Sequence, residues 1–318
     1  MPAATAPTTP ELVDIHCHGA VGHAFGDTDQ GSREAANYLR QRGIRQIVAS
    51  LVSGPPATLE RQVATLAPLV ADGTLTGIHL EGPFLAPACR GAHDPAALRH
   101  PDPALVEHLA AVAADLGAPR AIRQLTFAPE LPGADRLIAT LARLGVHPAV
   151  GHTAASAAQV RAALAAVAEA TGRPALVTHL FNGMPAFHHR DGGPAAAALA
   201  AAARGEAIVE LIADGVHVAP EVVQLVFDTV PQGHVVLISD AMAATGLGDG
   251  DYMLGTLPVR VAGGTARIVD PDGHAGAIAG STSTVADCLR WAIEVAGIPA
   301  SYAVPAATTS PRLALDLP

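Results

Sequence analysis

The chain has 318 residues, of which 50% are hydrophobic and 15% are charged, so it can form a large core and is not a disordered chain. The net charge of -10 excludes a protein that presents a basic face to nucleic acid. The length fits either one large α/β barrel or two ordinary domains.

Eight short apolar runs rich in β-branched residues predict strands along the chain. In chain order they are Leu12–His18, Gln46–Val52, Leu75–Gly82, Ile122–Glu130, His147–Thr153, Pro174–Gly183, Ile208–His217 and His234–Met242. Stretches with helical periodicity separate most of them and predict helices over Ser32–Arg42, Thr58–Ala71, Pro103–Leu116, Ala134–Leu144, Ala155–Ala170 and Pro220–Val230. Repeated strand–helix units predict a parallel sheet, and eight of them predict closure into a TIM-type (β/α)8 barrel.

An open, doubly wound sheet is the alternative fold for the same alternation. Such a sheet normally carries a glycine-rich phosphate loop after its first strand. The segment HGAVGHAFG, which follows the first predicted strand, matches the pattern GxGxxG poorly. We therefore expect one barrel domain that occupies residues 1–318.

Two features of the sequence concern where the protein works. No apolar run reaches the roughly 18 residues of a membrane helix, and the start, MPAATAPTTP, lacks the layout of a signal peptide. The cysteines Cys17, Cys89 and Cys288 are few and irregularly spaced, which is typical of a reducing compartment. We expect a cytoplasmic protein with neither a membrane nor a nucleic acid as partner.

Ionisable residues follow the apolar residues of several predicted strands. They are His16, His18, Glu81, His152, His179, His217 and Asp240. The carboxyl ends of barrel strands form one rim, where barrel enzymes carry out their chemistry. Each residue alone has an ordinary alternative, such as a hydrogen-bonded core histidine or a helix N-cap. Crowded together in a dry barrel mouth they would be costly without a partner, so we expect a divalent cation there.

The segment DIHCHGA indicates how two of these residues meet. Side chains two positions apart in a strand share a face, so His16 and His18 can converge while Cys17 points the other way. Imidazole and carboxylate ligands together predict zinc or iron rather than magnesium or calcium. Such a metal lowers the pKa of a bound water towards about 7. With Asp240 as general base and His217 as the group that polarises a carbonyl, we expect metal-assisted hydrolysis of an amide or ester.

A series of motifs resembles those of the N-acetylglucosamine-6-phosphate deacetylases, a family of the amidohydrolase superfamily. In order they are DIHCHG, GIHLEGPFL, GHT, THLFNGM, ADGVHV, SDAMAATG and IAGSTST, and the matches run from about Asp14 to about Arg312. The resemblance implies a main catalytic metal held by Glu81, His152 and His179. It implies a second metal, bridged by Glu81, on His16 and His18. Some members lack this histidine pair and work with one metal, so we expect one or two ions.

The same resemblance implies the roles of the groups around the substrate. Asp240 matches the acid/base aspartate of the family, His217 the histidine that contacts the acetamide carbonyl, and His93 a sugar-contacting histidine. The reaction that follows is removal of the acetyl group from N-acetylglucosamine 6-phosphate, which gives glucosamine 6-phosphate and acetate. Three alternatives remain open: the galactosamine analogue as substrate, a cyclic amide as substrate, and a non-catalytic sugar-phosphate sensor.

The phosphate of such a substrate needs cationic or N–H donors. Arg190, in FHHRDGG, matches the phosphate-binding arginine of the family, which reaches into the neighbouring subunit, and a planar guanidinium can donate two parallel hydrogen bonds to a phosphate. The backbone of Asn182 and Gly183 is expected to add donors. The ordinary alternative for Arg190 is a surface charge. Cys89, on a loop near the expected mouth, is either idle or sensitive to oxidation.

One part of the family pattern is not matched. Family members carry a small β-sandwich built from segments before and after the barrel, and we expect most of this sandwich to be absent here. Outside the barrel, residues Leu254–Val269 predict a β-hairpin with its turn at Gly263–Gly264. An uncovered barrel face tends to recruit a partner, so we expect a homodimer.

Overall fold

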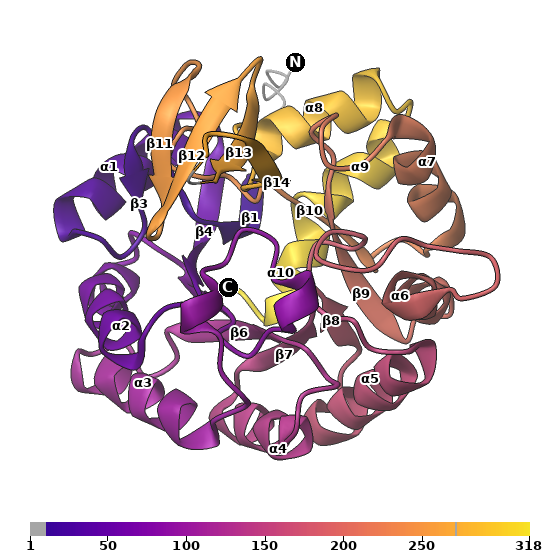
Figure 1. Ribbon diagram of the computed structural model, residues 1–318, viewed down its shortest axis with the longest axis horizontal. Coiled ribbons are helices and arrows are strands. Elements are labelled where there is room, and N and C mark those ends of the chain that lie inside the picture. Colours follow the sequence, from indigo (N-terminus) through magenta and orange to yellow (C-terminus); the bar gives the residue numbers. More distant parts are fainter. Residues whose placement is uncertain (1–10, 271) are drawn as a thin grey trace, which may run out of the picture.

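The structure is a computed structural model that describes residues 11–270 and 272–318. Eight parallel strands surround a central axis and helices cover them on the outside (Figure 1). The strands are β1 (Leu12–Cys17), β4 (Ile44–Val52), β5 (Gly77–Glu81), β6 (Ile122–Phe127), β7 (His147–Val150), β8 (Ala175–Val177), β9 (Ala207–Ile212) and β10 (Val235–Ile238). Their order in the sheet follows their order in the chain. The predicted (β/α)8 barrel is confirmed, because a doubly wound sheet would reverse its strand order.

The seam between the first and last strands closes just beyond their ends. Cys17 and Ala241 form a parallel bridge. The backbone N–H of Asp240 donates to the carbonyl of His16 at 2.9 Å, and that of His18 donates to the carbonyl of Ala241 at 2.7 Å. These bonds bring the predicted site residues of the first and last strands together.

The helices are α1 (Asp29–Gln41), α2 (Pro56–Ala71), α3 (Pro103–Asp115), α4 (Ala134–Leu144), α5 (Ala157–Thr171), α6 (Gly193–Ala203), α7 (Pro220–Thr229), α8 (Val285–Glu294), α9 (Ala300–Ala306) and α10 (Thr309–Leu315). Capping decides where they begin. α1 begins three residues earlier than predicted because the Thr28 side chain accepts from the N–H of Gly31. α5 begins with a capping box between Ser156 and Gln159. Within the described residues, no helix is both long and apolar enough to cross a membrane.

Seven of the eight predicted strands are too long at their carboxyl ends, and only the second ends as predicted, at Val52. β8 ends at Val177 and β9 at Ile212, whereas the sequence predicts strands that continue to Gly183 and His217. After β8, His179 adopts a left-handed backbone conformation with φ 24°, which a strand cannot accommodate. After β9, a turn forms in which the Asp214 carboxylate accepts from the N–H groups of the residues two and three positions on.

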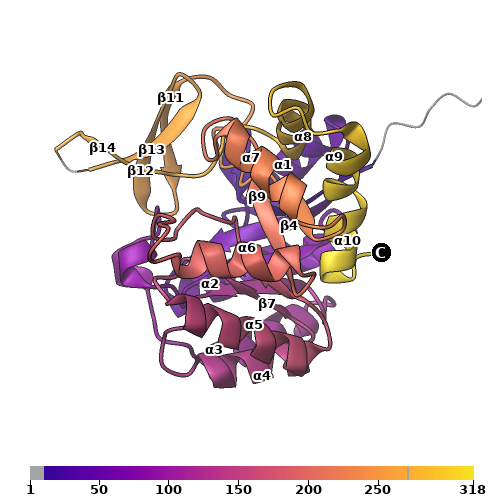
Figure 2. The same ribbon diagram turned by 90° about the vertical axis from the view of Figure 1, so that its right-hand side faces the viewer.

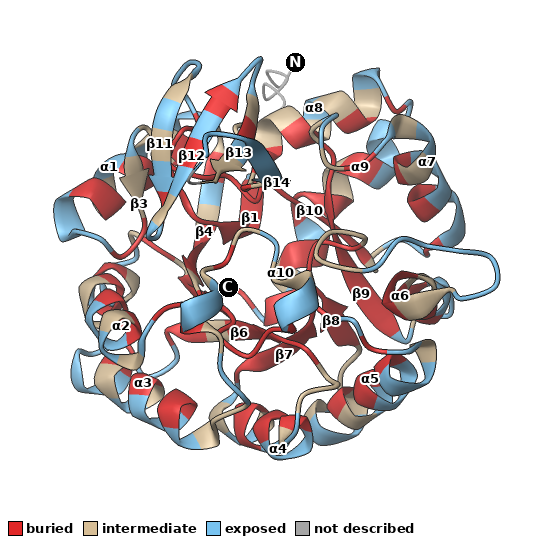
Figure 3. Ribbon diagram, in the orientation of Figure 1, coloured by how far each residue is buried: buried red, intermediate tan, exposed pale blue. Residues whose placement is uncertain are grey.

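Two apolar layers hold the barrel together. Buried side chains fill the space between the strands and the surrounding helices, so the inward faces of the helices and nearly all of the strands are buried in Figure 3. A second cluster lies inside the barrel, where Val13, Ile15 and Ile238 pack with Leu315 and Leu317. The last helix, α10, therefore closes the amino end of the barrel, and the carboxyl end is left for the polar residues.

A separate antiparallel sheet lies at the end of the barrel formed by the carboxyl ends of its strands. It contains β11 (Gly250–Leu254), β12 (Leu257–Ala262), β13 (Thr265–Val269) and β14 (Ala275–Ile278) in sequential order. The turn between β12 and β13 is at Gly263 and Gly264, with φ 56° and 75°, a region that favours glycine. Val259 and Val261 of β12 pack on Met242 of the barrel loops. Figure 2 shows this sheet at one end of the molecule and α10 at the other.

Candidate active site and metal centre

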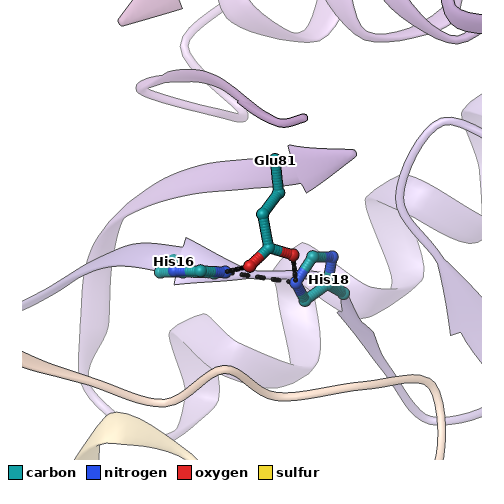
Figure 4. Close-up of side chains that lie close together, drawn as sticks. All are labelled: His16, His18 and Glu81. Carbon is teal, nitrogen blue, oxygen red and sulfur yellow. Dashed lines mark hydrogen bonds and ion pairs between the residues drawn. The ribbon is translucent and has the colours of Figure 1, made fainter. Parts of the chain in front are cut away.

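The Glu81 carboxylate is the centre of a cluster of histidines at the barrel mouth. Glu81 is the last residue of β5 and is 3% exposed. One carboxylate oxygen, Oε1, lies 2.9 Å from Nε2 of His179 and 3.0 Å from Nε2 of His152. The other, Oε2, lies 3.2 Å from Nε2 of His18, and Nε2 of His16 lies 3.5 Å from Oε1. Figure 4 shows His16 and His18 converging on Glu81 from β1 and the residue after it.

The donor atoms fall into two sets that share Glu81. Three ligand atoms of His16, His18 and Glu81 lie within 4.8 Å of one another, and so do three of Glu81, His152 and His179. Within the sets, imidazole nitrogens face each other: Nε2 of His152 is 3.0 Å from Nε2 of His179, and Nε2 of His16 is 3.2 Å from Nε2 of His18. Nitrogens that converge on each other and on a carboxylate are the arrangement that a bound cation satisfies.

The outer nitrogens of two ligands fix the direction of the inner ones. Nδ1 of His152 donates to the carbonyl of Cys89 at 2.8 Å, and Nδ1 of His16 donates to the Glu210 carboxylate at 3.0 Å. Because Nδ1 carries the hydrogen, the Nε2 lone pair points into the cluster, which is the tautomer that binds a metal. The residues present therefore fit a divalent metal, and the shared carboxylate fits a bridge between two.

The charges at the centre compensate one another. Burial would raise the pKa of Glu81, but His16, His93 and His152 hold it well below its usual value, so the carboxylate is ionised. Burial would lower the pKa of His18, but Asp240 and Glu81 raise it to about 9. Because the pKa of His18 is raised, binding of a metal by this imidazole would release a proton.

Three residues of the site adopt left-handed backbone conformations directly beyond their strands. They are His152 with φ 47°, His179 with φ 24° and Asp240 with φ 51°. Such a conformation costs a non-glycine residue on the order of 1 kcal/mol and persists where the surrounding structure requires it. Half of the six non-glycine residues with a positive φ in the described part of the chain therefore belong to this cluster.

Asp240 is an ionised carboxylate beside the histidine pair. Its Oδ1 lies 3.2 Å from Nε2 of His18 and 3.5 Å from Nε2 of His16. Burial would raise the pKa of Asp240, but the hydrogen bond from His18 and the charge of His16 lower it to about 2. A carboxylate that is ionised at neutral pH can accept a proton from a water molecule held in the cluster.

His217 lies on the loop after β9, so the prediction that it belongs to the seventh strand is wrong. Its Nδ1 lies 2.8 Å from the Asp214 carboxylate, which also accepts a hydrogen bond from Ser281 Oγ at 2.8 Å. Burial would lower the pKa of His217, but Asp214 raises it. With Nδ1 bonded to Asp214, Nε2 remains for a ligand, and it carries a hydrogen when the ring is an imidazolium.

A hollow of about 210 Å³ opens above the cluster. Besides the ligands it is lined by His93, Asn182, Gly183, His217 and Asp240. His93 Nδ1 accepts from the N–H of Ser53 at 3.1 Å, so its Nε2 carries the hydrogen and lies 3.3 Å from Glu81. A Cβ at Gly183 would lie 2.8 Å from His152 Nδ1, so glycine is required for this approach.

Arg190 is not among the residues that line the hollow. It is exposed on the loop before α6, where its guanidinium lies 3.1 Å from Nε2 of His189. Cys89 contributes its carbonyl to the cluster, and its thiol is half-buried, with burial raising the pKa of the thiol. The structure thus brings the predicted metal ligands together with Asp240, His217 and His93, and it leaves Arg190 outside the hollow.

Several supporting residues are not identified by the sequence patterns. Glu210, fully buried on β9, contacts His16 Nδ1 and also accepts from the backbone N–H of His179 at 3.3 Å. Asp14 accepts from Ser239 Oγ at 2.5 Å across the seam of the barrel. A single carboxylate inside the apolar run AIVELI was the available signal for Glu210, since a buried charge requires a partner.

Comparisons with known proteins agree with this geometry, although no family model matches the chain. The N-acetylgalactosamine-6-phosphate deacetylase of Escherichia coli O157:H7 is 32% identical over 313 residues, 97% of this chain and 78% of that protein. The N-acetylglucosamine-6-phosphate deacetylase of Homo sapiens is 32% identical over 320 residues, 97% of this chain and 74% of that protein. The chain also matches the crystal structure of N-acetyl-D-glucosamine-6-phosphate deacetylase from Mycobacterium smegmatis, with 39% sequence identity and a TM-score of 0.89. This match covers 100% of this chain and 82% of the Mycobacterium smegmatis chain.

A mutant of the Mycobacterium smegmatis protein, in complex with N-acetyl-D-glucosamine-6-phosphate, matches with the same identity and TM-score over 99% of this chain and 83% of that one. The likeness extends over 97% of this chain for the human protein and 99% for the mutant structure, and so over nearly the whole described barrel. The chain belongs to the N-acetylglucosamine-6-phosphate deacetylase family of amidohydrolases.

Proposed function

We propose that this protein hydrolyses the acetamide of N-acetylglucosamine 6-phosphate to give glucosamine 6-phosphate and acetate. The observation that carries the proposal is the convergence of two ligand sets on Glu81 with the ionised Asp240 beside them. A sensor that only binds a sugar phosphate would not need an ionised carboxylate at this position. The barrel and its four-stranded sheet together form one catalytic domain in this proposal.

The cofactor in this proposal is a divalent metal, held in the main site by Glu81, His152 and His179 and in a second site by His16, His18 and the shared Glu81. Zinc suits the mixed imidazole and carboxylate donors, and iron suits them as well. When bound, the metal supplies Lewis acidity and lowers the pKa of water. The same donor set argues against magnesium and calcium, which prefer oxygen ligands.

Asp240 transfers the proton in the proposed reaction, and His217 donates a hydrogen bond to the substrate. Asp240 takes a proton from the attacking water and later delivers it to the leaving amine, a role supported by its ionised form and its position beside His18. His217, held by Asp214 through Nδ1, donates from Nε2 to the acetamide carbonyl oxygen. This donation requires the imidazolium form, which Asp214 stabilises.

His93, Asn182 and Gly183 contact the sugar phosphate in the hollow, and Arg190 contacts its phosphate. Because Arg190 is exposed outside the hollow of its own chain, the proposed contact is made in the hollow of a second copy. The active form is therefore a homodimer, and its location is the cytoplasm. An active monomer in light scattering would contradict both the dimer and this role of Arg190.

A second candidate substrate is N-acetylgalactosamine 6-phosphate, because the Escherichia coli relative carries that name at 32% identity. The two sugars differ at one hydroxyl group, and the comparison of kcat/KM on both substrates decides between them. The proposal as a whole is tested by acetate release from metal-loaded protein. Protein with a full metal complement that binds the sugar phosphate and releases no acetate would favour a sensor and contradict the enzyme.

A further inference from the structure

A second polar hollow lies at the opposite end of the barrel. It has a volume of about 210 Å³, and its polar lining comes from Arg120, Arg123, His147, Thr171, Arg173 and Asp316. These residues stand before or at the first residues of β6, β7 and β8, or just after α10. Because the strands are parallel, this basal hollow is at the amino end, whereas His152 and His179 lie beyond the carboxyl ends of the same strands.

The basal hollow carries an excess of positive charge. Arg173 pairs with the Asp316 carboxylate at 3.1 Å. Arg120 and Arg123 have no ion pair with any residue that the structure describes, although the whole chain has a net charge of -10. Burial and the neighbouring Arg120 lower the pKa of Arg123, the Asp316 carboxylate raises it, and Nε of Arg123 donates to the carbonyl of Thr76 at 3.3 Å. Two guanidiniums that repel each other beside a hollow are stabilised by an anion between them.

His147 adds a polar atom that needs a partner. It is the first residue of β7 and is 5% exposed. Its Nε2 is buried and has no hydrogen-bond partner among the described residues. Burial and the charge of Arg173 lower the pKa of His147 to about 4, against the opposing effects of the Pro174 backbone and the Asp316 carboxylate, so the ring is neutral at pH 7. A buried polar atom without a partner is costly, and native structures rarely retain one without a ligand or water.

The wall of the basal hollow is shaped by a glycine. Gly145 ends α4 in a left-handed conformation with φ 71°. A Cβ at this position would lie 3.1 Å from Nη2 of Arg120, closer than ordinary van der Waals contact. The absence of a side chain lets the Arg120 guanidinium lie against the backbone beside the hollow.

We propose that the basal hollow binds a small oxyanion of the phosphate class, either inorganic phosphate or the phosphate group of a small metabolite. Guanidinium groups match a tetrahedral oxyanion because each can donate two parallel hydrogen bonds. The volume suits one phosphate with a small attached group rather than a polymer. The inference does not depend on the deacetylase activity, because none of these residues belongs to the mouth.

The experiment measures binding by isothermal titration calorimetry in the Arg190→Gln background, which weakens the phosphate contact proposed for the active site. The ligands are inorganic phosphate and glucosamine 6-phosphate, with chloride at matched ionic strength as the reference. Arg120→Gln combined with Arg123→Gln should weaken binding about tenfold or more, since charge-assisted hydrogen bonds are lost. Arg40→Gln, at a half-buried residue of α1 that does not line the hollow, is the matched control and should leave binding unchanged.

The two ligands distinguish the two sources of the anion. Equal affinity for both would identify inorganic phosphate as sufficient, and tighter binding of glucosamine 6-phosphate would identify a metabolite, provided that the loss in the double variant is retained. Arg120→Gln alone, at an exposed side chain, guards against an unfolded double variant and should also weaken binding. Phosphate binding that is absent, or that is unchanged when Arg120 is substituted in folded protein, would overturn the proposal.

Discussion

The two ends of the barrel are built from the same strands and carry opposite chemistry. At the carboxyl end, Glu81 and Asp240 are ionised carboxylates within 3.5 Å of imidazole nitrogens. At the amino end, α10 packs Leu315 against the barrel interior and guanidiniums line the basal hollow. The difference teaches that the carboxyl end holds the strained, polar groups proposed for the reaction, while the amino end closes the core with an apolar helix and carries a separate, positively charged hollow. Substitutions at the two ends should therefore affect different measurements.

The largest effect is expected for Asp240→Asn at the mouth. The amide cannot take the proton from water, so kcat should fall about a thousandfold, in the range for loss of a general acid–base group. Metal content by elemental analysis and the melting temperature should stay near the wild-type values. A kcat within tenfold of the wild-type value, at equal metal content, would remove Asp240 from the proton transfer. His147→Gln at the base is the matched control and should keep kcat at neutral pH.

The free energy of unfolding should depend on pH through His147, at the amino end of the barrel. The folded protein keeps this ring neutral down to a pKa of about 4, below the ordinary value of 6.5. The unfolded chain takes up a proton near pH 6.5, so the free energy of unfolding should fall as the pH decreases from 6.5 to 4, by up to about 3 kcal/mol from this residue. In His147→Gln, denaturant unfolding should show a smaller loss over that range. An equal loss in both proteins would contradict the buried, neutral ring.

A smaller effect is expected for Glu210→Gln, which changes the support of His16 while leaving the ligands in place. Outer partners of metal-binding histidines are worth about 10–100-fold in metal affinity. Competition with a chelator should therefore show the larger loss of affinity at the His16 and His18 site, because Glu210 contacts the ring of His16 but only the backbone of His179. Unchanged affinity of both ions would show that the contact of Glu210 with His16 does not orient the ligand.

The smallest effect is expected for Asp214→Asn. Asp214 raises the pKa of His217, and the proposed hydrogen bond to the carbonyl requires the imidazolium. Activity should decline as the pH rises through the pKa of His217, and the amide should move this decline to lower pH. The pH profile of kcat measures the shift. Ser281→Ala, which removes a neutral donor to the same carboxylate, should leave the decline nearly in place, and a decline at the same pH in Asp214→Asn would exclude His217 as its source.

The sequence predicts the site at the carboxyl end of the barrel better than the hollow at the amino end, and the reason is physical. Each predicted ligand ends or follows an apolar strand. Because strands and helices alternate, the strands are parallel and their carboxyl ends share one rim, which places Glu81, His152 and His179 together. Strand ends are harder to predict because they depend on left-handed residues such as Asp240, whose conformation follows from tertiary contacts. The contact between His16 and Glu210 joins positions 194 residues apart, and only the closed barrel brings them together.

The amino end of the barrel shows what the sequence pattern fails to predict. Arg120 and Arg173 precede strands and Arg123 is the second residue of β6. Arginine at such positions is ordinarily a surface residue, so nothing in the pattern indicates that the three meet. The four-stranded sheet is similar: the turn at Gly263–Gly264 has a clear glycine signal, whereas β14 is short and mostly exposed and has little apolar alternation to indicate a strand.

The central claim is that Glu81 is shared by two metal sites, and metal stoichiometry tests it most directly. Elemental analysis of purified protein, reloaded with zinc and dialysed, should give up to two ions per chain, because two ligand sets are present. Glu81→Gln should lose both ions together while the protein remains folded, whereas His18→Gln should lose only one. Glu81→Gln protein that retains the metal content of the wild type would contradict the account.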